Sequence, residues 1–397
     1  MQYGYKSVWY KNTWLILSVI GLLLGLGIVF AFMNAPQAVI KQEPPEQKEL
    51  KHNTVSVVAM GDMLAYDSVV DNAKTVEGYD FTKFFSKINS LYKDSDVIFC
   101  NQEGPTAGPS LGISGYPLLN GPTEFARDLQ TGAGCNLINI ANDHIADKGQ
   151  PGIDATIDVW KKLQPLAIAG ANKKSEDQNT VQYFTKNDIK IAFVAFADTN
   201  NNASIPTTSV NIYHDEKLVR RLLTDARANA DFVFVSVHWG TENSPTANED
   251  QEKTSKLFAE LGADVVVGTG PHVIQKVAYV NGVNNHRTLV WYSIGNMLST
   301  QQDINELTGG LARFTINKIG TAHATIGDLT FIPTFMSYVW SPKDRGVGKL
   351  QTRTDLMIYP LSSAETAINA MFPGYSVNER RQYVRTALGN YVSVELQ

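Results

Sequence analysis

The sequence is poor in cysteine. Among 397 residues only Cys100 and Cys135 occur, which is too few for a disulfide scaffold and lacks metal-type spacing. Each lies in an apolar run, so we expect buried free thiols. If Asn101 and Asn142 reach the same sheet edge, the two thiols are offset by about six residues, on the order of 20 Å. The sequence therefore predicts no disulfide, and the low count fits a cytosolic or a bacterial extracytoplasmic protein.

The sequence also lacks a basic block, a fixed-period repeat and a long low-complexity tract. Its formal net charge is -5, with 34 Lys+Arg against 39 Asp+Glu. Nucleic acid is therefore not expected as a partner, because phosphate contacts need clustered positive charge. With 43% hydrophobic residues, the chain can bury a full core as one large domain with appendages or as two domains.

Residues 13–33 carry no charge and are rich in Leu, Ile, Val and Gly. At about 1.5 Å per helical residue, such a run can span a bilayer. The alternative is a cleaved signal peptide, but its apolar region usually has about 7–15 residues. Lys11 lies nearer the apolar run than Lys41 does, so we expect residues 1–12 in the cytoplasm and the remainder outside. Residues 34–53, rich in Pro, Glu and Lys, are expected to form a stalk.

Strands and helices are expected to alternate along most of the chain. Apolar, β-branched runs predict strands at 55–60, 97–100, 136–141, 189–196, 232–237, 264–267 and 288–292. Helical spacing is found at 80–92, 153–163, 216–230 and 251–261. Later, 310–334 and 355–359 alternate as antiparallel strands, and 363–391 forms helical turns. The sequence therefore predicts an α/β fold built on a largely parallel sheet.

Polar side chains follow five of the predicted strands. They are Asp62, Asn101, Glu103, Asn142, Asp143, His144, His238 and His272. Carboxylate, amide and imidazole groups are ligands for Mn, Fe or Zn, and open α/β sheets place ligands at the strands' carboxyl ends. Each residue alone also fits a helix cap, an Asx turn or a hydrogen-bonded surface imidazole. The other histidines, His52, His214, His286 and His323, are interpreted as structural or solvated.

Several of these motifs, in order, resemble a known family. They are Gly61-Asp62-Met63-Leu64, Asn101-x-Glu103, Ala141-Asn142-Asp143-His144-x-x-Asp147-x-Gly149, His238-Trp239-Gly240-x-Glu242, Gly262-Ala263-Asp264 leading to Pro271-His272-Val273, and Tyr292-Ser293-Ile294-Gly295-Asn296. Over about residues 55–300 the chain is similar to the CapA/PgsA capsule proteins. That family is tied to poly-γ-glutamate biosynthesis and is a branch of the calcineurin-like metallophosphoesterase superfamily.

The resemblance implies a four-layer αββα sandwich of the metallophosphoesterase type, preceded by one transmembrane helix. The main domain would cover 54–340, with 341–397 packed on it. One or two divalent ions (Mn, Zn or Fe) would bind at one edge. The implied metal residues are Asp62, Asn101, Glu103, Asn142, His238 and His272, the implied catalytic residues are His144 and Asp143, and the implied substrate-binding or supporting residues are Asp147, Trp239, Glu242, Thr269 and Asn296.

The chain departs from the superfamily pattern at four positions. Leu64 stands where the first motif has His, and Glu103 stands where the second usually has Asp. Asp143 replaces the usual Asn, and Thr269 replaces a His often seen in the last motif. Two imidazole ligands are thus missing. A two-metal site, a one-metal site and a site that binds without turnover all remain open.

The resemblance also implies a function and a location. We expect a membrane-anchored, single-pass protein whose domain lies outside the cell and assists polymer synthesis or export. Its expected partners are the membrane, a poly-γ-glutamate synthetase or export complex, and the anionic polymer. One alternative is a metal-dependent surface phosphoesterase. A second alternative is an anchored binding domain with a vestigial site.

Overall fold

The computed structural model describes residues 9–33 and 51–395. The chain divides into two compact units, Met1–Glu49 and Leu50–Gln397. The first unit contains helix α1 (Trp9–Met33), which covers the segment expected to span a membrane. Within the described ranges, however, no helix is both long and apolar enough to cross a bilayer, so the structure does not support the predicted transmembrane helix. Residues 1–8 and most of the predicted stalk, 34–50, lie outside the described ranges.

The second unit is built on two sheets. The larger has nine strands, in the order β16-β15-β14-β1-β4-β5-β6, with β13 paired to β1 and β17 to β15. Its strands are β1 (His52–Leu64), β4 (Val97–Glu103), β5 (Leu137–Asn139), β6 (Ala167–Ala169), β13 (Asn296–Leu298), β14 (Thr308–Ile319), β15 (Thr325–Val339), β16 (Thr354–Pro360) and β17 (Ser393–Val394). Strands β1, β4, β5 and β6 are parallel, whereas β14, β15 and β16 are antiparallel, as the sequence predicts.

The smaller sheet has six strands, in the order β11-β12-β10-β9-β8-β7. They are β7 (Gln182–Lys186), β8 (Ile189–Ala197), β9 (Phe232–His238), β10 (Val265–Thr269), β11 (Val277–Asn281) and β12 (Arg287–Trp291). The four central strands are parallel. They are apolar on both faces, as expected for strands covered on both sides.

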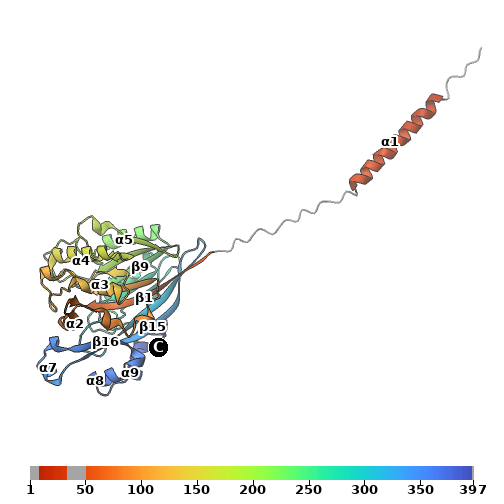
Figure 1. The fold of residues 1–397 in the computed structure, drawn as a ribbon. Helices are drawn as coiled ribbons and strands as arrows, with labels where there is room; N and C mark the ends of the chain where they lie inside the picture. Colours follow the sequence, from red (N-terminus) through yellow and green to blue (C-terminus); the bar gives the residue numbers. More distant parts are fainter. Residues whose placement is uncertain (1–8, 34–50, 396–397) are drawn as a thin grey trace, which may run out of the picture. The chain divides into compact units, whose positions relative to one another are not determined.

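Aromatic rings fill the space between the sheets. Phe99 of β4 lies 6.3 Å from Phe193 of β8 and 5.5 Å from Phe234 of β9, measured between ring centroids. Alternate residues of β8 and β9 face the other way, toward α5 (Glu216–Asn229) and α6 (Glu249–Glu260). Helices α3 (Thr123–Thr131) and α4 (Gly149–Leu163) pack against the larger sheet (Figure 1). The predicted mixed α/β fold is confirmed, with helices outside two facing sheets.

Four further helices lie within residues 51–395, together with several 3₁₀ turns. They are α2 (Asp67–Ala73), α7 (Pro342–Gly346), α8 (Glu365–Met371) and α9 (Val377–Leu388), and the 3₁₀ turns η1 (Thr82–Phe85), η2 (Asn89–Leu91), η3 (Pro109–Leu111), η4 (Asp177–Asn179), η5 (Leu350–Thr352) and η6 (Leu361–Ser363). A short hairpin joins β2 (Lys74–Thr75) to β3 (Gly78–Tyr79). The prediction of a helix at 80–92 was therefore wrong: that segment forms η1 and η2, and its apolar spacing reflects the buried Phe81, Phe84 and Phe85.

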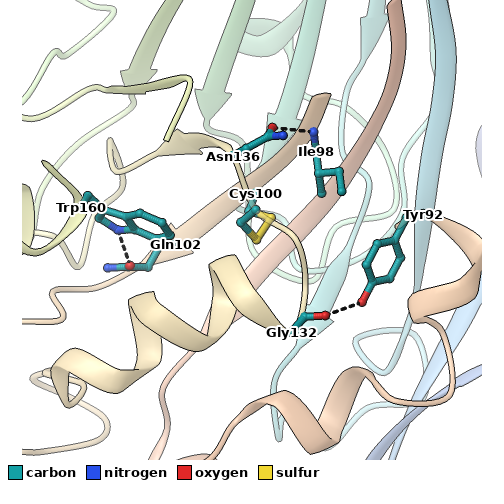
Figure 2. Close-up of a disulfide and its surroundings, with 8 residues drawn as sticks. Tyr92, Ile98, Cys100, Gln102, Gly132, Asn136 and Trp160 are labelled. Carbon is teal, nitrogen blue, oxygen red and sulfur yellow. Dashed lines mark hydrogen bonds between the residues drawn. A yellow bond between two sulfur atoms is a disulfide. The ribbon is translucent and has the colours of Figure 1, made fainter. Parts of the chain in front are cut away.

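The prediction that no disulfide forms was wrong. Cys100 and Cys135 are bonded, with their Cα atoms 5.7 Å apart (Figure 2). Strand β5 begins only at Leu137, and Asn101 pairs with Asn139 rather than with Asn142. Cys135 precedes the strand, in the turn after α3, where its amide donates to the carbonyl of Leu129. The turn brings Cys135 over the sheet instead of extending along it, so the assumed offset does not apply.

Candidate metal centre

The first two site residues come from neighbouring parallel strands. Asp62 of β1 pairs in register with Asn101 of β4, and both side chains are fully buried. Nδ2 of Asn101 donates to Oδ1 of Asp62 at 2.6 Å, and Oδ1 of Asn101 accepts from Nδ2 of Asn139 at 2.8 Å. The amide of Asn101 therefore holds the carboxylate in place, and Asn139 fixes which way that amide points.

Close backbone packing sets the position of Asp62. A Cβ atom at Gly61 would lie only 1.7 Å from the carbonyl oxygen of Gly295, so only glycine fits there. The amide of Asp62 donates to that same carbonyl at 3.2 Å. His272 has a left-handed backbone with φ of 60°, which is rare for a non-glycine residue and is found mostly at functional sites. Local backbone geometry thus aims both side chains.

Two histidines from the smaller sheet complete the cluster. His238 ends β9, and His272 follows β10. Nδ1 of His272 lies 3.2 Å from Oδ2 of Asp62, and Nε2 of His238 lies 3.1 Å from Oδ1 of Asp143. Nδ1 of His238 lies 3.8 Å from Oδ1 of Asp62. The carboxyl ends of strands from both sheets therefore meet at one point, as the sequence predicts.

Glu103 occupies the centre of this group. It ends β4 and is 2% exposed, and its Oε1 lies 3.8 Å from Nε2 of His272. Its Oε2 is buried and has no hydrogen-bond partner within 51–395. Leaving such an oxygen unpaired costs about 1–3 kcal/mol or more, so a buried orphan needs a partner from elsewhere.

Glu103 belongs to two sets of potential ligands. One set joins it to Asp62 and His238, and the other joins it to Asp143 and His144. Within each set one ligand atom per residue lies within 4.8 Å of the others. A carboxylate shared between adjacent sets is suited to hold one ion or to bridge two.

The loop after β5 supplies the outer part of the site. Nδ1 of His144 lies 2.7 Å from Oδ2 of Asp147, and the same oxygen accepts from the amide of Leu119 at 2.7 Å. Nδ2 of Asn201 donates to Oδ2 of Asp143 at 3.1 Å. Asp147 therefore orients the imidazole of His144, and Asn201 orients the carboxylate of Asp143.

Burial and neighbouring charges shift the pKa values of the cluster. Burial raises the pKa of Glu103 to about 7. Burial opposes protonation of His272 and His238, but the nearby carboxylates raise their pKa values to about 10 and about 9. Burial likewise opposes the charged form of Asp62, yet the hydrogen bond and charge of His272 hold its pKa below the usual range. The raised pKa values of His238 and His272 mean that protonation of these imidazoles would compete with binding of a cation.

His144 and Asp143 show the same balance. Burial disfavours the charged imidazole, but the hydrogen bond to Asp147 and the charge of Asp143 raise the pKa of His144 to about 9. Burial opposes the charge on Asp143, and its contact with His238 nevertheless holds its pKa well below the usual range. A protonated His144 beside an ionised Asp143 can donate a proton to a bound group at neutral pH.

The other predicted residues play supporting parts. Oδ1 of Asn142 accepts from the amide of Gly104 at 3.0 Å, and its Nδ2 donates to the carbonyl of Gln102 at 2.8 Å. Both polar atoms of Asn142 are thus engaged with main chain, and the side chain fixes the loop. Trp239 is buried, and its Nε1 donates to the carbonyl of Tyr292.

Three further predicted residues surround the histidines. Thr269 places its hydroxyl 3.2 Å from Nδ1 of His238. Asn296 places Oδ1 3.0 Å from Nδ1 of His272, which orients that ring. Glu242 is exposed and adds negative potential that raises the pKa of His272. These three residues lie around the cluster, whereas Asp62, Glu103, Asp143, His144, His238 and His272 form it.

Sequence reasoning missed Asn139 and Asn201. Asn139 ends β5 and could have been found by the rule that polar residues at strand ends matter. Asn201 lies in a loop far along the chain, and no sequence signal marks it.

Another group of potential ligands, Asp264 with His286 and His323, lies outside this cluster. Nε2 of His323 is 2.9 Å from Oδ1 of Asp264. His323 is therefore the hydrogen-bond partner of a buried carboxylate.

The residues present fit a divalent cation. Carboxylate and imidazole atoms converge, and one buried glutamate oxygen has no partner in the described chain. Imidazole with carboxylate suits Mn, Fe or Zn. The ligands that the geometry supports are Asp62, Glu103, Asp143, His238 and His272.

The family model described as "Bacterial capsule synthesis protein PGA_cap" matches residues 56–301. The chain is 26% identical over 310 residues to "PGA biosynthesis protein CapA" of Bacillus subtilis (strain 168), covering 75% of this chain and 77% of that protein. It is 25% identical over 324 residues to "Capsule biosynthesis protein CapA" of Bacillus anthracis, covering 79% and 75%.

Among solved structures, the chain is similar to the NAD nucleotidase NadN of Haemophilus influenzae. The TM-score is 0.44 at 13% identity, covering 87% of this chain and 58% of that one. The family match spans more than half of the chain and includes every residue of the cluster. The chain belongs to the bacterial capsule synthesis protein family PGA_cap.

Proposed function

We propose that this protein assists the synthesis or export of an extracellular poly-γ-glutamate capsule. The family match and two relatives named for capsule biosynthesis support this proposal. The two relatives align over three quarters or more of this chain, so the similarity extends beyond the motifs. A membrane synthetase or export complex and the anionic polymer are the proposed partners.

The proposal includes a divalent metal at the central cluster. The buried, unpartnered Oε2 of Glu103 is the observation that carries it. Asp62 and His238 would hold an ion on one side of Glu103, and Asp143 would hold one on the other. When bound, such an ion polarises an oxygen of the substrate and lowers the pKa of a bound water.

The chain's own groups would handle protons and orientation. Asp147 holds Nδ1 of His144, which leaves Nε2 of the same ring facing the cluster near Asp143, at 3.6 Å from Oδ2. A proton on Nε2 of His144 is then positioned for a leaving group. Asn101 and Asn296 keep Asp62 and His272 in fixed orientations.

We also propose that the folded unit acts outside the cytoplasmic membrane. The disulfide between Cys100 and Cys135 supports this location, because disulfides persist in oxidising compartments and are rare in the cytosol. The charge-free run at 13–33 is the proposed attachment to the membrane. Protease added to intact protoplasts should digest the unit, whereas digestion only after lysis would place it inside.

The function is tested by deleting the gene and measuring extracellular poly-γ-glutamate. We expect the polymer to be lost and to be restored by the parent gene. Glu103→Gln should fail to restore it, because the shared ligand is neutral, whereas the exposed His52→Ala should restore it fully. Unchanged polymer in the deletion strain would contradict the proposed function.

A metal-dependent phosphoesterase is the second candidate. The pair formed by His144 and Asp147 favours it, because an oriented imidazolium is suited to protonate an alkoxide leaving group. The full chain should then hydrolyse an alkyl phosphate monoester such as glycerol phosphate when Mn²⁺ is added, and His144→Asn should abolish hydrolysis. Metal binding without any hydrolysis would instead support a binding domain with a vestigial site.

A further inference from the structure

A cavity lies beside the metal centre. Its volume is about 280 Å³, and it lies among α2, the loop that carries Tyr116, the segment after β13, and η5. The residues that line it are Tyr66, Asp67, Ser68, Tyr116, Glu242, Thr300, Gln301, Gln302, Leu350 and Arg353. Arg353 lies outside residues 56–301, so the family's matched region does not contain the cavity's main cation.

Arg353 is a buried cation without a carboxylate partner. It is 5% exposed, and no ion pair joins it to an acidic residue of 51–395. Its Nε donates to the carbonyl of Leu350 at 2.7 Å, but its buried Nη1 has no hydrogen-bond partner in that range. Burial lowers its pKa. Tyr338 and Asp67 only partly oppose that effect, so an anionic ligand would offset the remaining cost of burying the charge.

The surroundings hold Arg353 in place. Its guanidinium carbon lies 5.3 Å from the ring centre of Tyr338 and 5.5 Å from that of Trp340. Its main-chain carbonyl accepts from Nδ2 of Asn72 in α2 at 2.7 Å. Stacking on aromatic rings leaves the planar edge of a guanidinium available for a two-pronged bond to a carboxylate. The guanidinium of Arg353 is therefore held in a fixed orientation before any ligand binds.

The cavity is joined to the metal centre by direct contacts. The ring of Tyr116 lies 6.2 Å from that of His144. Gln301 accepts a hydrogen bond from Asn296, whose other side-chain atom contacts His272. Burial and the charges of Glu103, Glu242 and Asp143 raise the pKa of Tyr66. Residues that line the cavity therefore contact residues of the metal centre directly.

The remaining lining groups narrow the ligand chemistry. Gln301 and Gln302 offer amide groups, which can pair with amide bonds of a ligand. Asp67 and Glu242 are exposed carboxylates at the rim, so Arg353 is the only group of the lining whose positive charge can bind a ligand carboxylate. The cavity therefore matches one carboxylate at Arg353 with an amide bond nearby.

We propose that this cavity binds a carboxylate group of an amide-linked substrate whose reacting part lies at the metal centre. A γ-linked glutamate chain carries that combination of groups in each unit. This inference rests on the proposed function, because it names the substrate class of the same site. It assigns Arg353 as a substrate-binding residue.

The test measures binding of a γ-linked glutamate oligomer to the detergent-solubilised full chain by calorimetry. Arg353→Met should weaken binding by about tenfold or more, the loss expected for a hydrogen bond to a charged group. Arg353→Lys keeps the charge but not the two-pronged geometry, and it should also weaken binding. Arg345→Met is the matched control, because Arg345 is exposed and stacks on Trp340 without lining the cavity.

Several outcomes decide the proposal. Equal binding by the parent, Arg353→Met and Arg353→Lys would overturn it, as would no binding by the parent. Inorganic phosphate serves as a second probe: binding of phosphate at Arg353 without binding of the oligomer would overturn the carboxylate assignment. If Arg353→Met does not fold in a thermal melt, Arg353→Lys decides.

Metal content is measured on the same samples, and binding is repeated with EDTA. Arg353→Met should retain the parent's metal content. Loss of oligomer binding in Arg353→Met with metal retained supports this inference. A parent protein that contains no metal would contradict the proposed metal centre. In that case, oligomer binding measured in EDTA still tests whether Arg353 binds the ligand carboxylate.

Discussion

Oε1 of Glu103 lies 3.8 Å from Nε2 of His272, and both side chains are buried. Without a metal, protonated His238 and His272 would balance the acidic residues, because the neighbouring carboxylates raise the pKa values of these imidazoles to about 9 and about 10 against the effect of burial. A cation bound here would replace those protons, because metal ligands must be deprotonated imidazoles and carboxylates. Metal and protons therefore compete for the same cluster.

This competition predicts a pH dependence of metal affinity. Below its raised pKa a histidine holds its proton, and a metal must displace that proton to bind. The affinity for metal should therefore fall as the pH is lowered and rise as the pH is raised. Because the pKa values are about 9 for His238 and about 10 for His272, the metal affinity should rise across the neutral and mildly alkaline pH range. Titration with Mn²⁺ at about pH 6 and about pH 8 should show tighter binding at the higher pH. Affinity that is constant or falls with pH would contradict this prediction.

The disulfide predicts a specific loss of stability. It closes a loop with a sequence separation of 35, so replacing Cys100 and Cys135 together by Ala should reduce the free energy of unfolding by about 2–4 kcal/mol. Urea unfolding of the full chain measures this loss, with the parent before and after reduction as the control. Alkylation of the unfolded, unreduced parent should label no thiol. Two labelled thiols would show that the bond is absent.

Gly61 predicts a localised steric effect. In Gly61→Ala the new Cβ would meet the carbonyl oxygen of Gly295, so β1 must shift beside Asp62. We expect a loss of about 3 kcal/mol or more in unfolding free energy, together with weaker metal binding. Gly346→Ala is the control, because a Cβ there meets nothing within 4 Å. Similar unfolding midpoints for both variants in urea would contradict the prediction.

Most of the residues of the site could be predicted from the sequence, because a buried parallel strand is recognised by its run of apolar residues. Its carboxyl end then places the next polar residue at the sheet's edge. Asp62, Glu103, His238 and His272 all obey this rule, and the structure brings them together. The order of strands within the sheets was not needed for that inference.

What the sequence could not supply depends on register and on long-range packing. Strand β5 has only three residues, so its pairing with β4 could not be read from an apolar run that continues to Ala141. That register decides whether Cys135 can reach Cys100. Arg353 follows a 3₁₀ turn far from every motif, and only tertiary structure shows that it lines the cavity beside the metal centre.

The most direct test of the metal centre is elemental analysis of Mn and Zn bound to the purified full chain. The comparison uses the parent, Glu103→Gln and His52→Ala, the last because His52 is exposed and belongs to none of the ligand groups within the described residues. We predict near-stoichiometric metal in the parent and in His52→Ala, and little metal in Glu103→Gln. A parent without metal, or equal loss in Glu103→Gln and His52→Ala, would contradict the account.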